Sequence, residues 1–406
     1  MSSAEAKLRN LVEKALFSEN LEKYELKFCG GTEKGEGYIG DITFVDVLGE
    51  NRHGSKVEYS LVLKTGGQNK TLRPIVRLGF EREIHVYSKI LPAFWNLQDE
   101  HLMKRFQSIP RCYLTMLSDH NEALVLENIK SLGFKLYDRK QVMTLDHIQA
   151  VLKVLGQWHA LSFALKEKKP LLLEQLTCNW KCTAAAIFVN SHVGEWINLA
   201  QKYLIQTLEV QEELELLHKY KEKTRNQTAT DIIKSILSIE KHQVVVTHGD
   251  CWNNNLMFKY QDFSLNVPSE VKILDFQIAS ISSPVIDLSY FIYAVSSEEQ
   301  LQHFPQLLKT YYEALSACLQ EIECVPDQIF SYSDLIRHWQ NFSAYGAMVN
   351  PMVVCDNLVD KDDAVSYTNN NENYETIIQT VDQKQKKLFT SRIVAVAKHF
   401  VHCEFQ

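Results

Sequence analysis

The stretch HGDCWNNN, residues 248–255, decides the fold, and a second stretch, ILDFQ at 273–277, belongs with it. An apolar run at 256–258 follows the first stretch, and a polar turn over 261–270 separates it from a second apolar run that ends at Asp275. Two such runs around a turn predict a β-hairpin. This hairpin would return Asp275 to the side of Asn255, where both side chains could hold one Mg²⁺ ion, since Mg²⁺ prefers oxygen ligands.

The spacing of the polar residues inside the first stretch indicates the type of reaction that the chain could catalyse. Four residues separate Asp250 from Asn255, as in the catalytic loop H-x-D-x-x-x-x-N of kinases. There the aspartate accepts a hydroxyl proton and the asparagine binds a metal ion. Taken singly, Asp250 and Asp275 would be ordinary turn or strand-end residues. Together with the hairpin between them, they predict phosphoryl transfer, with Asp250 as the base and Asn255 and Asp275 as the metal ligands.

A kinase also needs a phosphate-covering loop upstream of the catalytic loop. The candidate is GGTEKGEGY at 30–38, before a strand predicted at 39–48. Gly35 and Gly37 lack a Cβ, so the backbone N–H groups of the loop can approach phosphate oxygens. The spacing is not a strict G-x-G-x-x-G, and by itself the segment also fits an ordinary hairpin turn.

A strand lysine and a helix glutamate should follow in that order. Lys64 ends the apolar segment VEYSLVLK at 57–64, and the turn before it at 50–54 predicts a β-hairpin. It could point into a cleft or extend to water. A helix is predicted over 80–91 and is expected to end at Pro92. Glu83 flanks its apolar face and can reach Lys64, whereas Glu81 lies further round the helix and is the weaker candidate.

The segment ALVLENI at 123–129 is an apolar strand that ends in a polar break. In a kinase, the backbone of such a segment binds the adenine edge of the nucleotide. Here the carbonyl of Glu127 and the N–H of Ile129 would do so. The alternative is an edge strand that leaves a sheet.

Composition narrows the possible partners and compartments. The 406 residues are 45% hydrophobic and 23% charged, with a net charge of −7 and no long basic run, so binding to nucleic acid or an anionic membrane is not expected. Residues 1–17 predict an amphipathic helix without the apolar core of a signal peptide. No apolar run approaches the ~20 residues that span a bilayer. The nine cysteines show no zinc-site spacing and predict free thiols in the cytoplasm.

The remaining chain divides into two kinds of segment. Residues 20–127 are predicted to be strands with one long helix, and 141–240 to be mostly helical. Later helices are expected at 288–295, 305–323, 332–349 and 377–400, and a mobile loop at 356–375. One amphipathic helix is predicted over 204–221, and His159 is expected to be a packed core histidine. Asp287 is expected to cap a helix, to brace the catalytic loop, or both.

These motifs resemble those of the ecdysteroid kinase-like family, within the aminoglycoside and choline kinase branch of the kinase-like superfamily. The residues that carry the resemblance lie at 35–38, Lys64, 80–92, 126–128, 155–160, 248–255, 275–277 and 284–288. The resemblance implies an α+β, bilobal protein-kinase-like fold. A small β-rich lobe with one main helix (1–127) would bind the nucleotide, and a large, mostly helical lobe (128–406) would carry catalysis and the acceptor.

The resemblance also implies ATP and Mg²⁺ as cofactors and a small-molecule alcohol as substrate, such as an ecdysteroid. Lys64 would bind the α- and β-phosphates and pair with Glu83. Only 278–286 separate Gln277 from Asp287, which leaves no room for the activation loop of a protein kinase. Two further alternatives are a pseudokinase that binds ligand without turnover and a metallohydrolase using His248, Asp250 and Asp275. The aromatic residues from Tyr290 onward could line an apolar acceptor pocket, but they favour a core role.

Overall fold

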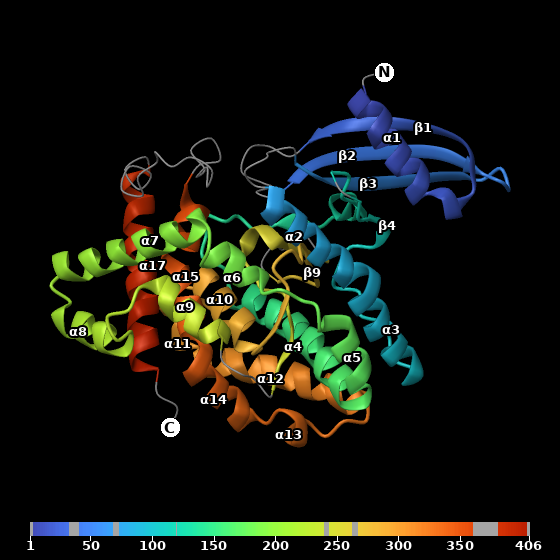
Figure 1. Cartoon of the computed structure of the whole chain (residues 1–406). Helices are drawn as coiled ribbons and strands as arrows, with labels where there is room; N and C mark the ends of the chain where they lie inside the picture. Colours follow the sequence, from blue (N-terminus) through green and yellow to red (C-terminus); the bar gives the residue numbers. More distant parts are fainter. Residues whose placement is uncertain are drawn as a thin grey trace.

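A computed structural model describes residues 3–31, 40–67, 73–118, 120–238, 243–261, 267–359 and 381–403. Its N-terminal part contains one antiparallel sheet, whose first three strands are drawn in blue in Figure 1. The strand order is β1-β2-β3-β5-β4. The strands are β1 (Leu21–Gly31), β2 (Gly40–Asn51), β3 (Lys56–Gly66), β4 (Cys112–Met116) and β5 (Ala123–Glu127). The predicted hairpin with its turn at 50–54 is confirmed as β2 and β3, and β5 is an inner strand between β3 and β4.

The two faces of this sheet have different partners. Helix α1 (Ser3–Ala15), the predicted amphipathic helix, lies across one face in Figure 1. Its buried Leu11 and Val12 share a core with Leu61 and Leu63 of β3. Because side chains alternate along a strand, Lys64 is placed on the opposite face, toward the helical part of the molecule.

The helix after β3 is longer than predicted. α2 (Arg73–His85) runs through a π-helical turn at Val86–Ile90 into α3 (Leu91–Glu100). The expectation that Pro92 ends the helix is therefore wrong. Pro92 lies in the first turn of α3, where proline is tolerated because its missing N–H and its fixed φ suit a helix start. In the π turn the backbone hydrogen bonds run from residue i to i+5, and the α-helical pattern resumes after it in α3.

The C-terminal part is mostly helical, as predicted (Figure 1). Its helices up to the predicted catalytic loop, residues 248–255, are α4 (Leu145–Lys168), α5 (Pro170–Thr177), α6 (Thr183–Phe188), α7 (His192–Val210), α8 (Leu214–Lys223) and α9 (Ala229–Ser238). The single helix predicted over 204–221 is wrong, because α7 ends at Val210 and α8 begins at Leu214. The break contains Glu212 with a left-handed φ of 57°.

Short strands surround the catalytic loop. They are β6 (Lys135–Leu136), β7 (Val245–Thr247), β8 (Leu256–Lys259), β9 (Glu270–Ile273) and β10 (Ser280–Ser282). β8 and β9 form the predicted hairpin, with Leu256 opposite Ile273. β10 pairs with β7 in an antiparallel two-stranded sheet, so the segment after 275–277 returns directly to the strand that precedes the catalytic loop.

The remaining helices complete the core around α10. They are α10 (Val285–Val295), α11 (Glu298–Gln302), α12 (Phe304–Glu321), α13 (Pro326–Ile329), α14 (Tyr332–Phe342), α15 (Ala344–Leu358) and α17 (Gln383–His402). Every residue of α10 is buried. The helix predicted over 332–349 is divided, because Ser343 ends α14 and α15 begins at Ala344. Residues 360–380, which include most of the predicted loop, lie outside the described residues.

Candidate active site

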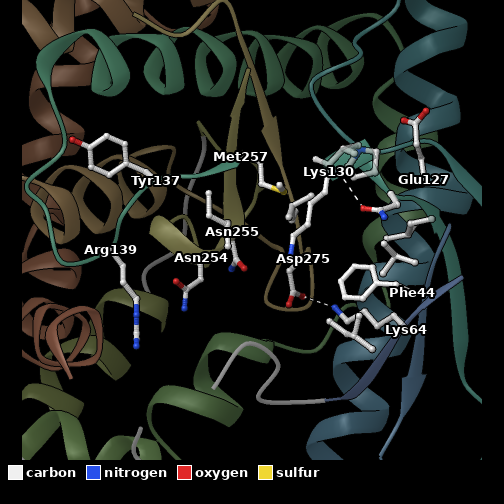
Figure 2. A pocket seen from close by; sticks show the side chains of 18 of the residues that line it. Phe44, Lys64, Glu127, Lys130, Tyr137, Arg139, Asn254, Asn255, Met257 and Asp275 are labelled. Atoms are coloured by element: carbon white, nitrogen blue, oxygen red, sulfur yellow. Dashed lines mark hydrogen bonds and ion pairs between the residues drawn. The ribbon is translucent and has the colours of Figure 1, made fainter. Parts of the chain in front are cut away.

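A cavity of about 560 Å³ lies between the N-terminal sheet and the helical part. Figure 2 shows Phe44 and Lys64 on its sheet side, and Asn255, Met257 and Asp275 on the other. Much of its wall is apolar, and Lys64, Glu83 and Asp275 form a charged cluster in it. Its lining includes Ile42, Phe44, Val62, Lys64, Glu83, Leu126, Glu127, Asn128, Ile129, Arg139, Asn254, Asn255, Met257, Leu274 and Asp275.

Lys64 forms ion pairs with two acidic residues that line the cavity. Its Nζ lies 2.7 Å from Glu83 Oε2 on α2 and 2.9 Å from Asp275 Oδ1 after β9. Glu83 is fully buried and Lys64 nearly so, whereas a third of the Asp275 side chain is exposed. The predicted Lys64–Glu83 pair is thus present. The weaker candidate, Glu81, instead pairs with Arg77 on the surface of α2.

The ionisation of the buried pair follows from its surroundings. Burial alone would lower the pKa of Lys64, but the carboxylates of Asp275 and Glu83 raise it above its ordinary value. Burial raises the pKa of Glu83 to about 7, against the opposing charge of Lys64. Because Lys64 Nζ lies 2.7 Å from Glu83 Oε2 and stays charged, we describe the two as an ion pair.

The catalytic loop starts after β7 with a conformation that requires glycine. Gly249 has a φ of 87°, and a Cβ there would lie 2.5 Å from the carbonyl oxygen of Ile278. His248 Nδ1 accepts from the N–H of Asp250 at 3.2 Å, so its Nε2 donates to the Leu274 carbonyl at 2.8 Å. Both ring nitrogens are therefore used in holding the loop against the strand that carries Asp275.

Asp250 has a partner on each carboxylate oxygen. Asn255 Nδ2 donates to Oδ2 at 3.0 Å and to the Asp250 carbonyl at 2.9 Å. The Tyr290 hydroxyl donates to Oδ1 at 2.7 Å. Burial raises the pKa of Asp250, and the hydrogen bond from Tyr290 opposes that change. Since the Asn255 nitrogen is turned toward Asp250, its amide oxygen is the atom left for a metal ion.

The β8–β9 hairpin brings Asp275 back to Asn255. The Leu274 N–H donates to the Asn255 carbonyl at 2.9 Å, and Asp275 adopts a left-handed φ of 66°. One exposed carboxylate and one amide oxygen suit Mg²⁺, which uses one or two protein oxygens together with phosphate oxygens. The donor set therefore fits the metal that the motif implies.

Asp287 braces the catalytic loop from α10. Its Oδ2 accepts from the N–H of His248 and its Oδ1 from the N–H of Gly249, both at 2.7 Å. His159 of α4 adds a contact from Nε2 to Asp287 Oδ2 at 3.0 Å, and the Tyr311 hydroxyl lies 2.9 Å from its other nitrogen. His159 is fully buried and is a core histidine, as predicted, but one that also supports the loop.

Of the other predicted nucleotide-binding residues, two line the cavity and two lie outside the described residues. Glu127 ends β5 and Ile129 begins the short 3₁₀ helix η3 (Ile129–Leu132), and both line the cavity. Gly35 and Gly37 lie outside the described residues.

Sequence reasoning missed the contact of Tyr290 with Asp250. The aromatic residues after 290 are largely buried, in agreement with the core role, and Tyr290 combines burial with this contact.

Several general expectations can be compared with the described residues. There, no group of three or more histidine, cysteine, aspartate or glutamate side chains could hold a metal ion. All nine cysteines lie in described segments and are free thiols. No helix in the described segments is both long enough and apolar enough to cross a membrane.

Comparisons with known proteins agree with the sequence motifs. The model of the ecdysteroid kinase-like family matches residues 34–324, which is more than half of the chain. Two solved structures of aminoglycoside 2′-phosphotransferase-IIIa with GDP, one wild type and one a point mutant, are similar at 13% identity and a TM-score of 0.40. These alignments cover 97% of this chain and 98–99% of theirs. No curated protein matches significantly.

Proposed function

The chain belongs to the ecdysteroid kinase-like family, and on this premise we propose that it transfers the γ-phosphate of ATP to an alcohol group of a small molecule. An ecdysteroid or another hydroxylated lipophilic compound is the proposed acceptor. One observation carries the proposal: the Lys64–Glu83 ion pair, Asp275 and Asn255 line a single cavity, and Asn255 holds Asp250. Phosphoryl transfer depends mainly on such positioning and charge neutralisation.

The nucleotide has a suitable place in this cavity. The apolar wall formed by Val62, Leu126 and Met257 suits the adenine ring, with the backbone of Glu127 and Ile129 at its edge. Lys64 would hold the α- and β-phosphates, and Gly35 and Gly37 would cover them. Asn255 and Asp275 would hold Mg²⁺, which when bound neutralises charge on the transferred phosphate.

The reaction is a displacement at phosphorus. A bond forms between the acceptor oxygen and the γ-phosphorus, the bond to the β–γ bridging oxygen breaks, and ADP leaves with that electron pair. The proton of the acceptor hydroxyl passes to Asp250. Its carboxylate is held by Asn255 and Tyr290 and retains lone pairs that can face an acceptor.

A small acceptor is favoured over a protein. Between Asp275 and Asp287, all of which the structure describes, the chain forms a turn, β10 and the first turn of α10. An activation loop that shapes a peptide platform has no place there. The metallohydrolase alternative is disfavoured because both ring nitrogens of His248 are engaged, one by the Asp250 N–H and one by the Leu274 carbonyl. Neither nucleic acid nor a membrane is a partner in the proposal.

The test is transfer of labelled γ-phosphate from ATP to a panel of alcohols with Mg²⁺ present. The panel holds ecdysteroids, choline, ethanolamine, aminoglycosides and plant phenolic glycosides, and Asp275→Asn serves as the blank. Label on one acceptor that is lost in the blank supports the proposal and names the substrate class. Mg²⁺-dependent ATP binding without label on any acceptor would favour the pseudokinase alternative. Absence of ATP binding would overturn the proposal.

A further inference from the structure

Helix α10 contacts three successive residues of the catalytic loop. Asp287 accepts from the backbone of His248 and Gly249, and Tyr290 donates to the side chain of Asp250. Asp287 and Tyr290 are three positions apart, so they project from the same face of the helix. One helix face thus holds both the backbone before Asp250 and one oxygen of the Asp250 carboxylate itself.

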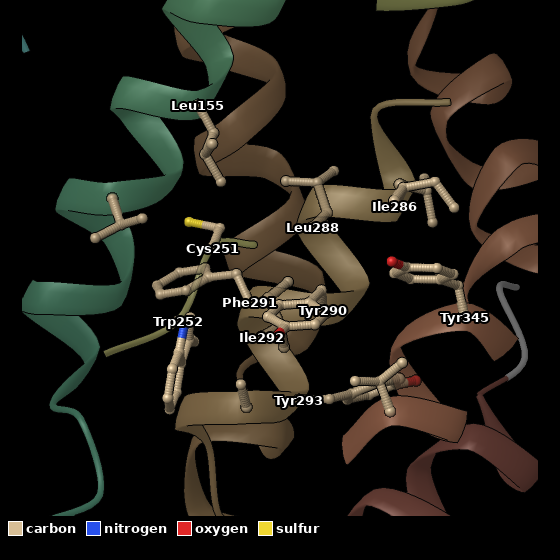
Figure 3. Close-up of a cluster of buried hydrophobic side chains, with 14 of the residues drawn as sticks. Leu155, Cys251, Trp252, Ile286, Leu288, Tyr290, Phe291, Ile292, Tyr293 and Tyr345 are labelled. Atoms are coloured by element: carbon tan, nitrogen blue, oxygen red, sulfur yellow. The ribbon is translucent and has the colours of Figure 1, made fainter. Parts of the chain in front are cut away.

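The Tyr290 side chain is itself fixed by packing. It is 4% exposed, and its ring centroid lies 6.4 Å from the rings of both Phe188 and Tyr345. Figure 3 shows Tyr290 on α10 between the loop that carries Cys251 and the helix that carries Tyr345. The phenol therefore has little freedom to turn away from Asp250.

The backbone beneath Tyr290 is fixed as well. Helix α15 meets α10 at Gly346, where a Cβ would lie 2.3 Å from the carbonyl carbon of Ser289 and 2.7 Å from the nitrogen of Tyr290. The Gly346 N–H also donates to the Ser289 hydroxyl at 3.3 Å. Such an approach is possible only without a side chain. The close packing of α15 thus fixes how far the Tyr290 backbone lies from the catalytic loop.

We propose that Tyr290 is a positioning residue for phosphoryl transfer, and that its hydroxyl fixes the orientation of the Asp250 carboxylate toward the acceptor. This inference rests on the proposed function. Asn255 and Tyr290 each hold one oxygen of Asp250, so the carboxylate cannot rotate about its last bond without losing a hydrogen bond. The lone pairs that remain are aimed at one place, where the attacking hydroxyl must lie.

The test compares Tyr290→Phe with Tyr345→Phe. Each change removes one oxygen atom from a buried tyrosine of the same aromatic cluster and keeps its ring. The Tyr345 hydroxyl has no hydrogen-bond partner among the described residues, so its loss controls for packing and for desolvation. The kcat and the KM for ATP are measured with the accepted alcohol, and rates are referred to the concentration of ATP-binding sites, which counts folded protein alone.

Tyr290→Phe is expected to lower kcat about ten- to a hundredfold and to leave the KM for ATP unchanged, since a small misplacement of a reacting group is costly. Tyr345→Phe is expected to keep the wild-type kcat. Equal kcat values in the two variants, or a Tyr290→Phe change confined to KM, would overturn the inference alone. Absence of transfer by the wild-type protein on every acceptor would overturn the proposed function and this inference together.

Discussion

Replacement of Asp287 by asparagine tests whether α10 holds the catalytic loop. The Asp287 carboxylate is fully buried and accepts three hydrogen bonds, from the backbone of His248 and Gly249 and from the ring of His159. Asparagine has nearly the same shape but offers one acceptor oxygen and one donor nitrogen. In either orientation of the amide, its nitrogen faces at least one backbone N–H.

The magnitude follows from the less damaging orientation. There the amide oxygen faces His248 and His159, and its nitrogen faces the N–H of Gly249. One hydrogen bond to a charged group is lost and two buried donors face each other, which costs about 2–4 kcal/mol of unfolding free energy. Because Gly249 precedes Asp250, the same change should displace the base, and kcat should fall about tenfold or more.

The assay is equilibrium unfolding in urea together with kcat for the accepted alcohol. Asp99→Asn is the matched control, because Asp99 pairs with Arg105 on the surface and exposed pairs contribute at most about 1 kcal/mol. A loss within about 0.5 kcal/mol of the control would refute the assigned hydrogen bonds, since their removal should cost more. The expected stability loss with an unchanged kcat would instead show that the loop keeps its position without Asp287.

Two further predictions concern the N-terminal part. Lys64→Met should lower the unfolding free energy by about 1–3 kcal/mol, because the buried Glu83 carboxyl loses its ion-pair partner and takes up a proton instead. Lys64→Met/Glu83→Met should recover that stability but not phosphoryl transfer. Urea unfolding and ATP turnover of both proteins check this. Glu122 accepts from Arg73 and Arg77, and these hydrogen bonds outweigh burial and lower its pKa from 4.5 to about 2. Its contribution to stability should be complete above pH 4.5 and decline as pH falls toward 2, and unfolding curves of Glu122→Gln should lack that decline.

The sequence was most informative where a function depends on residues close together in the chain. Asp250 and Asn255 belong to one loop, and the hairpin that returns Asp275 is short. Their proximity therefore followed from spacing and strand composition alone. Lys64 and Glu83 are also on successive elements, and helix periodicity placed Glu83 beside the apolar face, within reach of Lys64. The direction of the Lys64 side chain was left open. In each case few local rules determine the geometry.

Contacts across the helical part were harder to predict. Tyr290 and His159 reach the catalytic loop through helix packing, and nothing local distinguishes either from an ordinary core residue. The helix boundaries failed for a related reason. At Pro92 tertiary packing continued the helix through a π turn, and the break at Glu212 has no glycine or proline to announce it. A periodic apolar pattern predicts which face of a helix is buried, but not the residue at which the helix ends.

The short connection after the catalytic hairpin explains how the site can be held without an activation loop. The Thr247 hydroxyl before the loop donates to the carbonyl of Ser280 in β10, and within a few residues Asp287 and Tyr290 contact the loop from α10. In protein kinases the corresponding segment is long and is ordered by phosphorylation. Here the chain itself ties Asp275, the proposed metal ligand, to the helix that holds the proposed base. The proposed site is thus assembled by folding of the chain itself.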